Sequence, residues 1–199
     1  MEPVESDPRA LLEALKAVAV VLKSSEIRFA LAGGFAVYAR GGQDSRNDVD
    51  FVVHPDDVAA AKDALERSGI KVLQPPEDWL FKARYDDAPV DLIHRLMMGE
   101  IDEDLLSRSD RLSVDSVEMP VLSATDLVVA KLLSLSEHNC DLEPPLAVMR
   151  SLREQLDIDL VVKACEDQPF AEATLFLARR LGVLPGNDHV SRQGDSREA

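Results

Sequence analysis

The first thirty residues combine a helical stripe of apolar side chains with a short apolar run. Residues three and four apart share one face of a helix, and residues 8–25 show that spacing at Leu11, Leu12, Leu15, Val18 and Leu22. Pro8 is acceptable in a first helical turn. The run at 27–32 ends at Gly33-Gly34. The pattern therefore predicts an amphipathic helix followed by a buried strand.

Strands and helices alternate as far as residue 94. In chain order we expect a short helix at 35–40, a strand at 48–53, a helix at 56–68, a strand at 70–73, and an antiparallel pair at 79–85 and 89–94. Pro89 cannot donate a ladder hydrogen bond, which limits where it can lie in that pair. A charged stretch over 99–111 follows, and then one extended segment at 117–122.

Helical periodicity dominates the C-terminal half. A capping pattern at 123–126 opens a helix expected to run to about Glu137. A further helix is expected near 145–155, and one or two more over 156–182, interrupted at Pro169. The predicted fold is α+β (α/β-like), with a mixed central sheet flanked by helices and a helical C-terminal extension. We expect a core at 1–122, a helical region at 123–184 and a disordered tail at 185–199.

Charge and composition narrow the class of protein. The chain has 199 residues and a net charge of −15, which disfavours broad nonspecific binding to nucleic acid but allows a local basic groove. Its two cysteines form no metal-binding or disulfide motif. No apolar run is long enough to span a bilayer, and no signal peptide is recognised. We therefore expect a cytoplasmic protein without a membrane partner.

Acidic residues inside apolar strands carry the candidate chemistry. Gly33-Gly34 follows a strand, and after a spacer of thirteen residues, 35–47, come Asp48 and Asp50 with Val49 between them. Side chains at i and i+2 lie on one face of a strand, so the two carboxylates point the same way. Asp91 lies in a second acidic-in-apolar stretch. If the two strands are neighbours, the three carboxylates form one cluster.

Such a cluster is suited to a divalent cation. Closely spaced carboxylates repel each other, and Mg²⁺, which prefers oxygen ligands and bridges phosphates, removes that conflict. The backbone amides of Gly33 and Gly34 can approach a triphosphate closely because glycine has no Cβ. The arrangement is typical of two-metal phosphoryl transfer from a nucleoside triphosphate.

The stretch from about residue 30 to 95 resembles the signature of the DNA polymerase β-like nucleotidyltransferase superfamily. Within it, the chain is most similar to the AbiEii/MenT-type nucleotidyltransferase toxins of bacterial toxin–antitoxin systems, and this weaker resemblance extends to about residue 165. The resemblance implies that Lys131 contacts the nucleotide phosphates. It also implies that Asp157 or Asp159 supports the site, and it makes Arg46, in Ser-Arg-Asn before the first Asp, a candidate phosphate contact.

The function implied by the resemblance is Mg²⁺-dependent transfer of a nucleoside monophosphate to RNA. The expected acceptor is the 3′ end of tRNA, with the chain acting as a toxin that has a cognate antitoxin protein. Two alternatives stay open: nucleotidylation of an aminoglycoside or lincosamide antibiotic, and a non-catalytic module that binds a nucleotide or a partner. Plainer interpretations also stay open for Lys131, which suits a half-buried helix face, and for Asp157 and Asp159, which suit a helix N-terminus.

Overall fold

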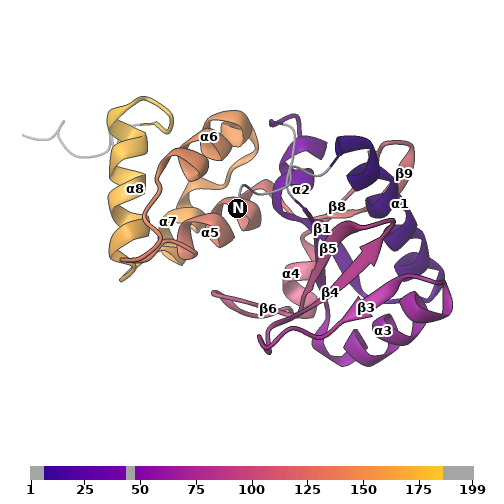
Figure 1. The fold of residues 1–199 in the computed structure, drawn as a ribbon. Helices are drawn as coiled ribbons and strands as arrows, with labels where there is room; N and C mark the ends of the chain where they lie inside the picture. Colours follow the sequence, from indigo (N-terminus) through magenta and orange to yellow (C-terminus); the bar gives the residue numbers. More distant parts are fainter. Residues whose placement is uncertain (1–6, 44–47, 186–199) are drawn as a thin grey trace, which may run out of the picture.

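The computed structural model describes residues 7–43 and 48–185, with a seven-stranded mixed sheet at its centre (Figure 1). The strand order is β3-β4-β5-β2-β1-β9-β8. The bounds are β1 Phe29–Ala32, β2 Val49–Val53, β3 Lys71–Leu73, β4 Leu80–Tyr85, β5 Ala88–Ile93, β8 Asp110–Val114 and β9 Val117–Val121. β2 pairs with β5 and β1 with β9 in parallel, and the other pairs are antiparallel. The sheet and the C-terminal helices confirm the predicted fold class.

Three helices of the N-terminal half pack on this sheet. α1 (Pro8–Ser24) begins where the Asp7 side chain accepts a hydrogen bond from the Arg9 amide, and it buries the predicted apolar stripe. α3 (Val58–Arg67) follows the 3-10 turn η1 (Pro55–Asp57) and packs against α1 and β3. α2 (Gly33–Ala39) contacts β1, β2 and the C-terminal helix that begins at Ala124. The apolar face that the sequence predicts for the first helix is therefore the face that packs on the core.

The predicted strand pair at β4 and β5 is confirmed, including its proline. Pro89 lies opposite Arg84 in the β4–β5 ladder. The pairing of β5 with β2 begins one residue later, at Val90. The proline thus precedes the part of β5 that has a neighbour on both sides.

The elements within the charged stretch were not predicted from the sequence. A small hairpin, β6 (Arg95–Leu96) with β7 (Gly99–Glu100), is followed by α4 (Glu103–Ser107) and by the edge strand β8. Of the five residues of β8 only Val114 is buried, so the strand lacks the alternating apolar signal of a half-buried strand. It forms instead through its hairpin with β9, across a turn at Asp115 and Ser116 with positive φ.

The C-terminal helices form a second lobe with an apolar core of its own (Figure 1). They are α5 (Ala124–Leu133), α6 (Glu143–Leu152), the 3-10 turn η2 (Arg153–Gln155), α7 (Ile158–Ala164) and α8 (Pro169–Arg180). The prediction that the first of them reaches Glu137 was wrong. α5 ends at Leu133 because the chain turns back at once, where Ser136 and Asn139 exchange backbone hydrogen bonds.

Arg40 joins the helical lobe to the core. Its side chain is only 6% exposed, and its guanidinium donates to the carbonyls of Leu122 and Val121 and to Asp110. The Gln155 amide donates in return to the Arg40 carbonyl at 2.9 Å. One buried side chain therefore ties the end of α2 to the strand β9, to β8 and to η2.

Across residues 7–43 and 48–185, no helix combines the length and the apolar character needed to cross a membrane.

Candidate active site

The sheet register brings the three predicted aspartates together. Asp50 and Asp91 are direct partners in the parallel β2–β5 ladder. Asp48 lies just before β2, and Val49 between the two acids is fully buried on the other side. Each aspartate can offer one carboxylate oxygen such that the three oxygens lie within 4.8 Å of one another. The predicted neighbourhood of the two strands is confirmed, and Asp48, Asp50 and Asp91 are called the triad below.

Gly33 lies against the triad, and only glycine fits there. Its φ is +59°, and a Cβ built on it would lie 1.9 Å from Oδ2 of Asp50. α2 begins at this glycine, two residues earlier than the predicted start at Phe35. The amides of a first helical turn have no acceptor within the helix. Phosphate binding by the amides of Gly33 and Gly34 stays a prediction.

Crowding changes the acidity of the triad. Burial first, and then the charges of Asp48 and Asp91, raise the pKa of Asp50 from an ordinary 3.8 to about 7. Burial and the charge of Asp91 also raise the pKa of Asp48. These carboxylates therefore hold protons more tightly than isolated ones do.

The donor set of the triad fits a hard divalent cation. Mg²⁺ binds carboxylate oxygens at about 2.0–2.1 Å, which places the oxygens around one ion within roughly 4 Å of each other. The triad oxygens lie within 4.8 Å of one another, so small movements of the side chains would bring them to that distance. A divalent cation would also relieve the repulsion that raises the pKa of Asp50.

Lys82 belongs to the site and was missed by the sequence analysis. It lies opposite Asp91 in the β4–β5 ladder, and its ammonium donates to both oxygens of Asp91, at 2.9 and 2.8 Å. The charge of Lys82 also lowers the pKa of both Asp48 and Asp50. The sequence did contain a signal for this pair. If the hairpin turn is placed at residues 86–87, the strand register puts Lys82 opposite Asp91.

Lys131 comes to the triad from the helical lobe. It is exposed on α5, and its charge lowers the pKa of Asp48 and of Asp50. The hydrogen bond between Gln155 and Arg40 and the packing of α2 against α5 hold the helix that carries Lys131 in this position. A role of Lys131 in binding phosphate stays a prediction.

The remaining predicted site residues are distributed differently. Asp157 caps α7, since its side chain accepts a hydrogen bond from the Leu160 amide and its own amide donates to the Thr125 hydroxyl. Asp159 lies exposed in the first turn of that helix. Both positions have a structural use, and support of the site by either one stays a prediction. Arg46 lies outside the described residues.

A groove of about 590 Å³ lies between the helical lobe and the β6–β7 hairpin. Its polar lining comes from Arg108, Ser123, Thr125, Asp126 and Lys163, and its apolar lining includes Met98, Val129 and Leu160. The Leu122 amide donates to the Leu31 carbonyl near the end of β1. The start of α5, which borders the groove, is therefore at the same end of the sheet as Gly33.

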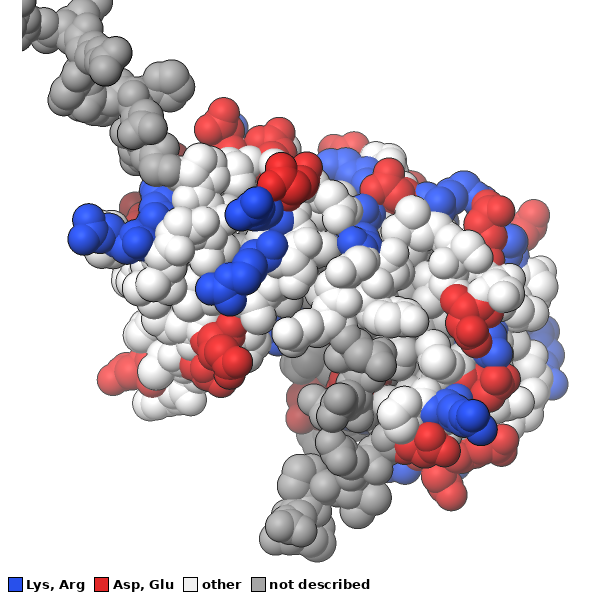
Figure 2. Space-filling view, turned by 90° about the horizontal axis from the view of Figure 1, so that it is seen from above, with Lys and Arg blue, Asp and Glu red and all other residues white. Residues whose placement is uncertain are grey.

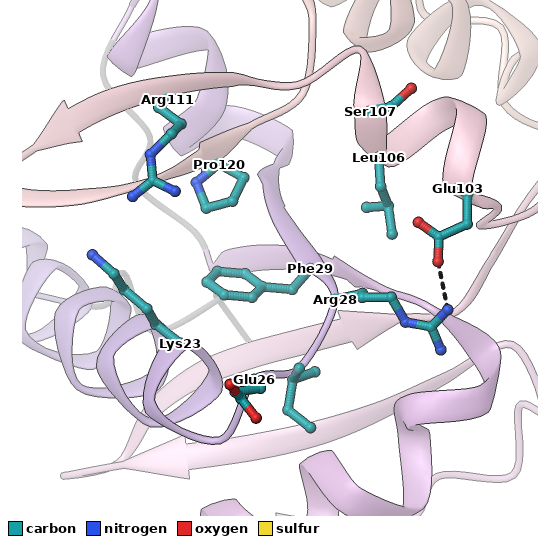
Figure 3. Close-up of a pocket in the computed structure, with 10 residues that line it drawn as sticks. Lys23, Glu26, Arg28, Phe29, Glu103, Leu106, Ser107, Arg111 and Pro120 are labelled. Atoms are coloured by element: carbon teal, nitrogen blue, oxygen red, sulfur yellow. Dashed lines mark hydrogen bonds and ion pairs between the residues drawn. The ribbon is translucent and has the colours of Figure 1, made fainter.

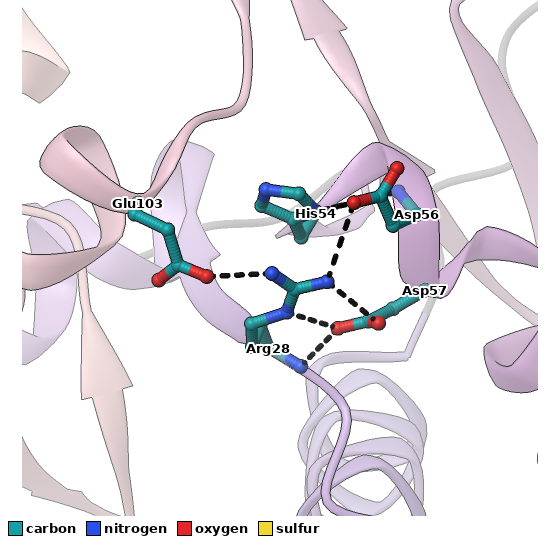
Figure 4. Close-up of polar contacts among 5 residues, drawn as sticks. All are labelled: Arg28, His54, Asp56, Asp57 and Glu103. Carbon is teal, nitrogen blue, oxygen red and sulfur yellow. Dashed lines mark hydrogen bonds and ion pairs between the residues drawn. The ribbon is translucent and has the colours of Figure 1, made fainter.

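A second polar cluster lies at the other end of β1 and serves the fold. Arg28 precedes β1, and its guanidinium binds Asp57 and Glu103 while its amide also donates to Asp57 (Figure 4). The adjoining cavity of about 360 Å³ is lined by Arg28, Lys23 and Arg111 (Figure 3). Each of these cations already has a partner, because Arg111 binds the carboxylate of Glu118 and Lys23 donates to the backbone carbonyl of the same residue.

The surface shows no segregation of charge on the face in Figure 2. Lys and Arg side chains are interspersed there with Asp and Glu over both lobes. Both the core, residues 1–122, and the helical region, residues 123–184, contain more acidic than basic residues. The charge distribution on this face is therefore unlike the continuous basic stripe of proteins that bind long nucleic acids.

Comparison with known families supports the chemistry that the triad suggests. A family described as uncharacterised nucleotidyltransferase matches residues 4–188 of the chain. No curated protein matches the chain significantly.

Solved structures share the fold at low sequence identity. The antibiotic-resistance factor ANT(2″)-Ia in solution matches with a TM-score of 0.53 and 16% identity, over 89% of this chain and 96% of that one. A crystal structure of ANT(2″)-Ia in complex with adenylyl-2″-tobramycin gives 0.51 and 14%, over 86% and 98%. The lincosamide antibiotic adenylyltransferase LnuA, with lincomycin bound, gives 0.51 and 14%, over 75% and 98%. At this level of identity the similarity establishes the fold alone.

Proposed function

Because the chain belongs to the family of uncharacterised nucleotidyltransferases that matches it over residues 4–188, we propose that its triad transfers a nucleoside monophosphate from a nucleoside triphosphate to a hydroxyl group. The observation that carries the proposal is the convergence of Asp48, Asp50 and Asp91, with oxygens within 4.8 Å, beside a glycine whose Cβ would collide with Asp50. A carboxylate cluster that only stabilised the fold would have no need of such crowding.

The reaction breaks one bond and forms one. The acceptor oxygen bonds to the α-phosphorus, the bond from that phosphorus to the bridging oxygen of the β-phosphate breaks, and pyrophosphate leaves with the electron pair. The hydroxyl proton passes to a triad carboxylate or to water. A divalent cation held by the triad would neutralise charge on the phosphates and favour the ionised acceptor.

The other residues of the site position the triphosphate. The amides of Gly33 and Gly34 lie at the start of α2, where phosphate oxygens find unsatisfied donors. Lys131, whose charge already reaches Asp48 and Asp50, binds phosphate oxygens from the helical lobe. The contacts of Arg40 between the core and the helical lobe hold the amides of α2 and the Lys131 side chain in fixed positions relative to each other.

For the acceptor we propose the 3′-terminal ribose of an RNA, with tRNA as the first candidate and a toxin role for the chain. The support is the resemblance of the Gly-Gly, Asp-x-Asp and later Asp motifs to nucleotidyltransferase toxins, together with the position of Lys131. An RNA held only by its end needs few phosphate contacts, which is compatible with the net charge of −15. A cognate antitoxin protein would then be the partner that inhibits the chain.

A small cationic antibiotic is the second candidate acceptor. The excess of acidic residues in both lobes favours a positively charged molecule. The chain also matches nearly the full length of an enzyme whose solved complex contains adenylyl-2″-tobramycin. The groove beside α5 and α7, with a volume of about 590 Å³, offers room for an acceptor of that size.

One experiment tests the reaction and both acceptors. The purified protein is incubated with Mg²⁺ and each α-labelled nucleoside triphosphate in turn, with total bacterial RNA in one series and with aminoglycosides and lincosamides in another. Asp50→Asn is the control variant. Label in a tRNA-sized band that the control lacks supports the RNA acceptor, and label on a drug supports the second candidate. Absence of transfer in both series contradicts the proposal.

The toxin role has a separate test in cells. Expression of the chain should arrest bacterial growth, and expression of the Asp50→Asn variant should not. Equal growth of the two strains would contradict the toxin role while leaving nucleotidyl transfer to be judged by the labelling experiment.

A further inference from the structure

The ion pair between Lys82 and Asp91 occupies the carboxylate that a metal ion would need. The ammonium donates to both oxygens of Asp91, at 2.9 and 2.8 Å. Asp91 offers one of its oxygens to the three-carboxylate cluster. A cation that binds Asp91 therefore competes with one already present, and this cation is part of the chain.

Backbone geometry fixes this pair. Lys82 and Asp91 are opposite each other in the β4–β5 ladder, and directly opposed side chains of a sheet lie close enough to interact. The Asp91 side chain is 14% exposed and that of Lys82 is 44% exposed. The Asp91 carboxylate is therefore mostly buried in the site, while the Lys82 side chain that binds it remains partly exposed to solvent.

The charge of Lys82 acts on the whole cluster. It lowers the pKa of Asp48 and of Asp50, and Lys131 has the same effect on both from the opposite lobe. Among the described residues, Lys82 and Lys131 are the cations that oppose the charges of the three carboxylates. The lysines of the metal-free protein therefore offset part of the repulsion among the crowded carboxylates, although the pKa of Asp50 stays raised to about 7.

We propose that Lys82 is a resident counter-cation of Asp91, which a divalent metal ion must displace to load the triad fully. This inference rests on the proposed metal-dependent function. It makes Lys82 a positioning residue that sets how tightly the free enzyme holds metal. Because the Lys82 side chain is partly exposed, its ammonium can leave Asp91 and bind phosphate oxygens of an incoming triphosphate instead.

The positive charge of Lys82 should therefore lower the affinity of the free enzyme for a divalent metal ion. Removal of a unit positive charge near a partly exposed divalent site should tighten metal binding about tenfold, from Coulomb's law with a screened protein dielectric. Lys82→Met removes the charge and keeps an aliphatic side chain of similar length. Lys82→Arg keeps the charge and the ability to bind both oxygens.

Arg84→Met is the matched control. Arg84 lies on the same strand two residues later, so its side chain is on the same face as that of Lys82. It is exposed, and its guanidinium donates to the Asp87 carbonyl. The control thus removes the same charge from the same strand without removing the partner of Asp91.

The test is a titration of each protein with Mn²⁺ alone, following the signal of free Mn²⁺ by electron paramagnetic resonance. We expect Lys82→Met to bind Mn²⁺ about tenfold more tightly than wild type, and Lys82→Arg and Arg84→Met to bind like wild type. In an Asp91→Asn background, the effect of Lys82→Met should largely disappear, because the two residues act as a pair. Thermal melting of the metal-free proteins checks that every variant is folded.

The outcomes separate this inference from the proposed function. Equal Mn²⁺ affinity of wild type and Lys82→Met overturns the role of Lys82 while nucleotidyl transfer is untouched. An equal gain in Lys82→Met and Arg84→Met also overturns it, because only general charge would then matter. Tighter binding in Lys82→Met alone supports it even if no acceptor is ever labelled. Failure of all the proteins to bind Mn²⁺ overturns both proposals.

Discussion

Gly33 and Asp50 are so close that a methyl group on residue 33 would lie 1.9 Å from the Asp50 Oδ2 atom. The contact joins the two motifs that the sequence separates by a spacer: the glycine pair after β1 and the acidic pair of β2. It arises because β1 and β2 are antiparallel neighbours, with Ala32 opposite Asp50. The glycine is therefore required by the position of a carboxylate as well as by its own backbone.

Gly33→Ala should abolish transfer by displacing the Asp50 carboxylate. The matched control is Gly69→Ala, because Gly69 also has a positive φ, +78°, but has open space where a Cβ would be. Both substitutions should cost about 1–2 kcal/mol for the left-handed backbone. Only Gly33→Ala should lose activity and metal binding, as measured by labelling and Mn²⁺ titration. Full activity in Gly33→Ala would contradict the placement of Asp50 in the site.

Asp50→Asn should reduce the rate of transfer more than about a hundredfold, since even residues that merely orient metal ligands are worth 10–100-fold. The substitution keeps the shape of the side chain and removes a charge that burial disfavours. The metal-free variant should therefore be at least as stable as wild type at neutral pH. Steady-state labelling and thermal melting check the two expectations, and retained turnover would remove Asp50 from the mechanism.

The stability of the metal-free protein should fall as pH rises through the titration of Asp50. The pKa of Asp50 is raised in the folded protein from 3.8 to about 7, chiefly by burial. Between these two pH values the folded state binds more protons than the unfolded chain. The protonated Asp50 therefore stabilises the folded state at low pH, and this stabilisation is lost as the pH rises toward neutral. Melting from about pH 4 to about pH 8 should show a decline that is clearly smaller in Asp50→Asn, where the raised pKa of Asp48 remains.

Mg²⁺ should reverse that decline. A cation that binds the ionised triad stabilises the folded state by mass action, and its effect should grow with pH because protonated Asp50 is a poor ligand. The shift in melting temperature caused by Mg²⁺ should therefore be larger near pH 8 than near pH 5. A shift independent of pH, or one retained in Asp50→Asn, would place the ion elsewhere.

Arg40→Met should loosen the joint between the lobes. The substitution leaves the carbonyls of Leu122 and Val121 and the carboxylate of Asp110 without their donor, at a cost of about 1–3 kcal/mol for a buried unsatisfied group. We expect the KM for the nucleoside triphosphate to rise more than kcat falls, because Lys131 approaches from the helical lobe. Arg153→Met, which removes an exposed arginine paired with Glu154, should leave both constants near wild type.

The sequence by itself determined the helices with strong apolar stripes, the buried strands and the Asp-x-Asp face. These features depend on residues a few positions apart, whose spacing sets which side chains share a face. Asp48 and Asp50 lie on one side of Val49 for this reason. The place of Asp91 beside them was predicted on the condition that the two strands are neighbours, and the parallel pairing of β2 with β5 meets that condition.

Only the tertiary structure decided that the edge strand forms and how the two lobes pack on each other. The edge strand β8 has too little apolar alternation to be seen, and it forms because β9 offers it a hairpin partner. The approach of Lys131 to the triad and the burial of Arg40 depend on the packing of the two lobes. Such contacts are fixed by the mutual fit of whole elements, which no local pattern of residues encodes.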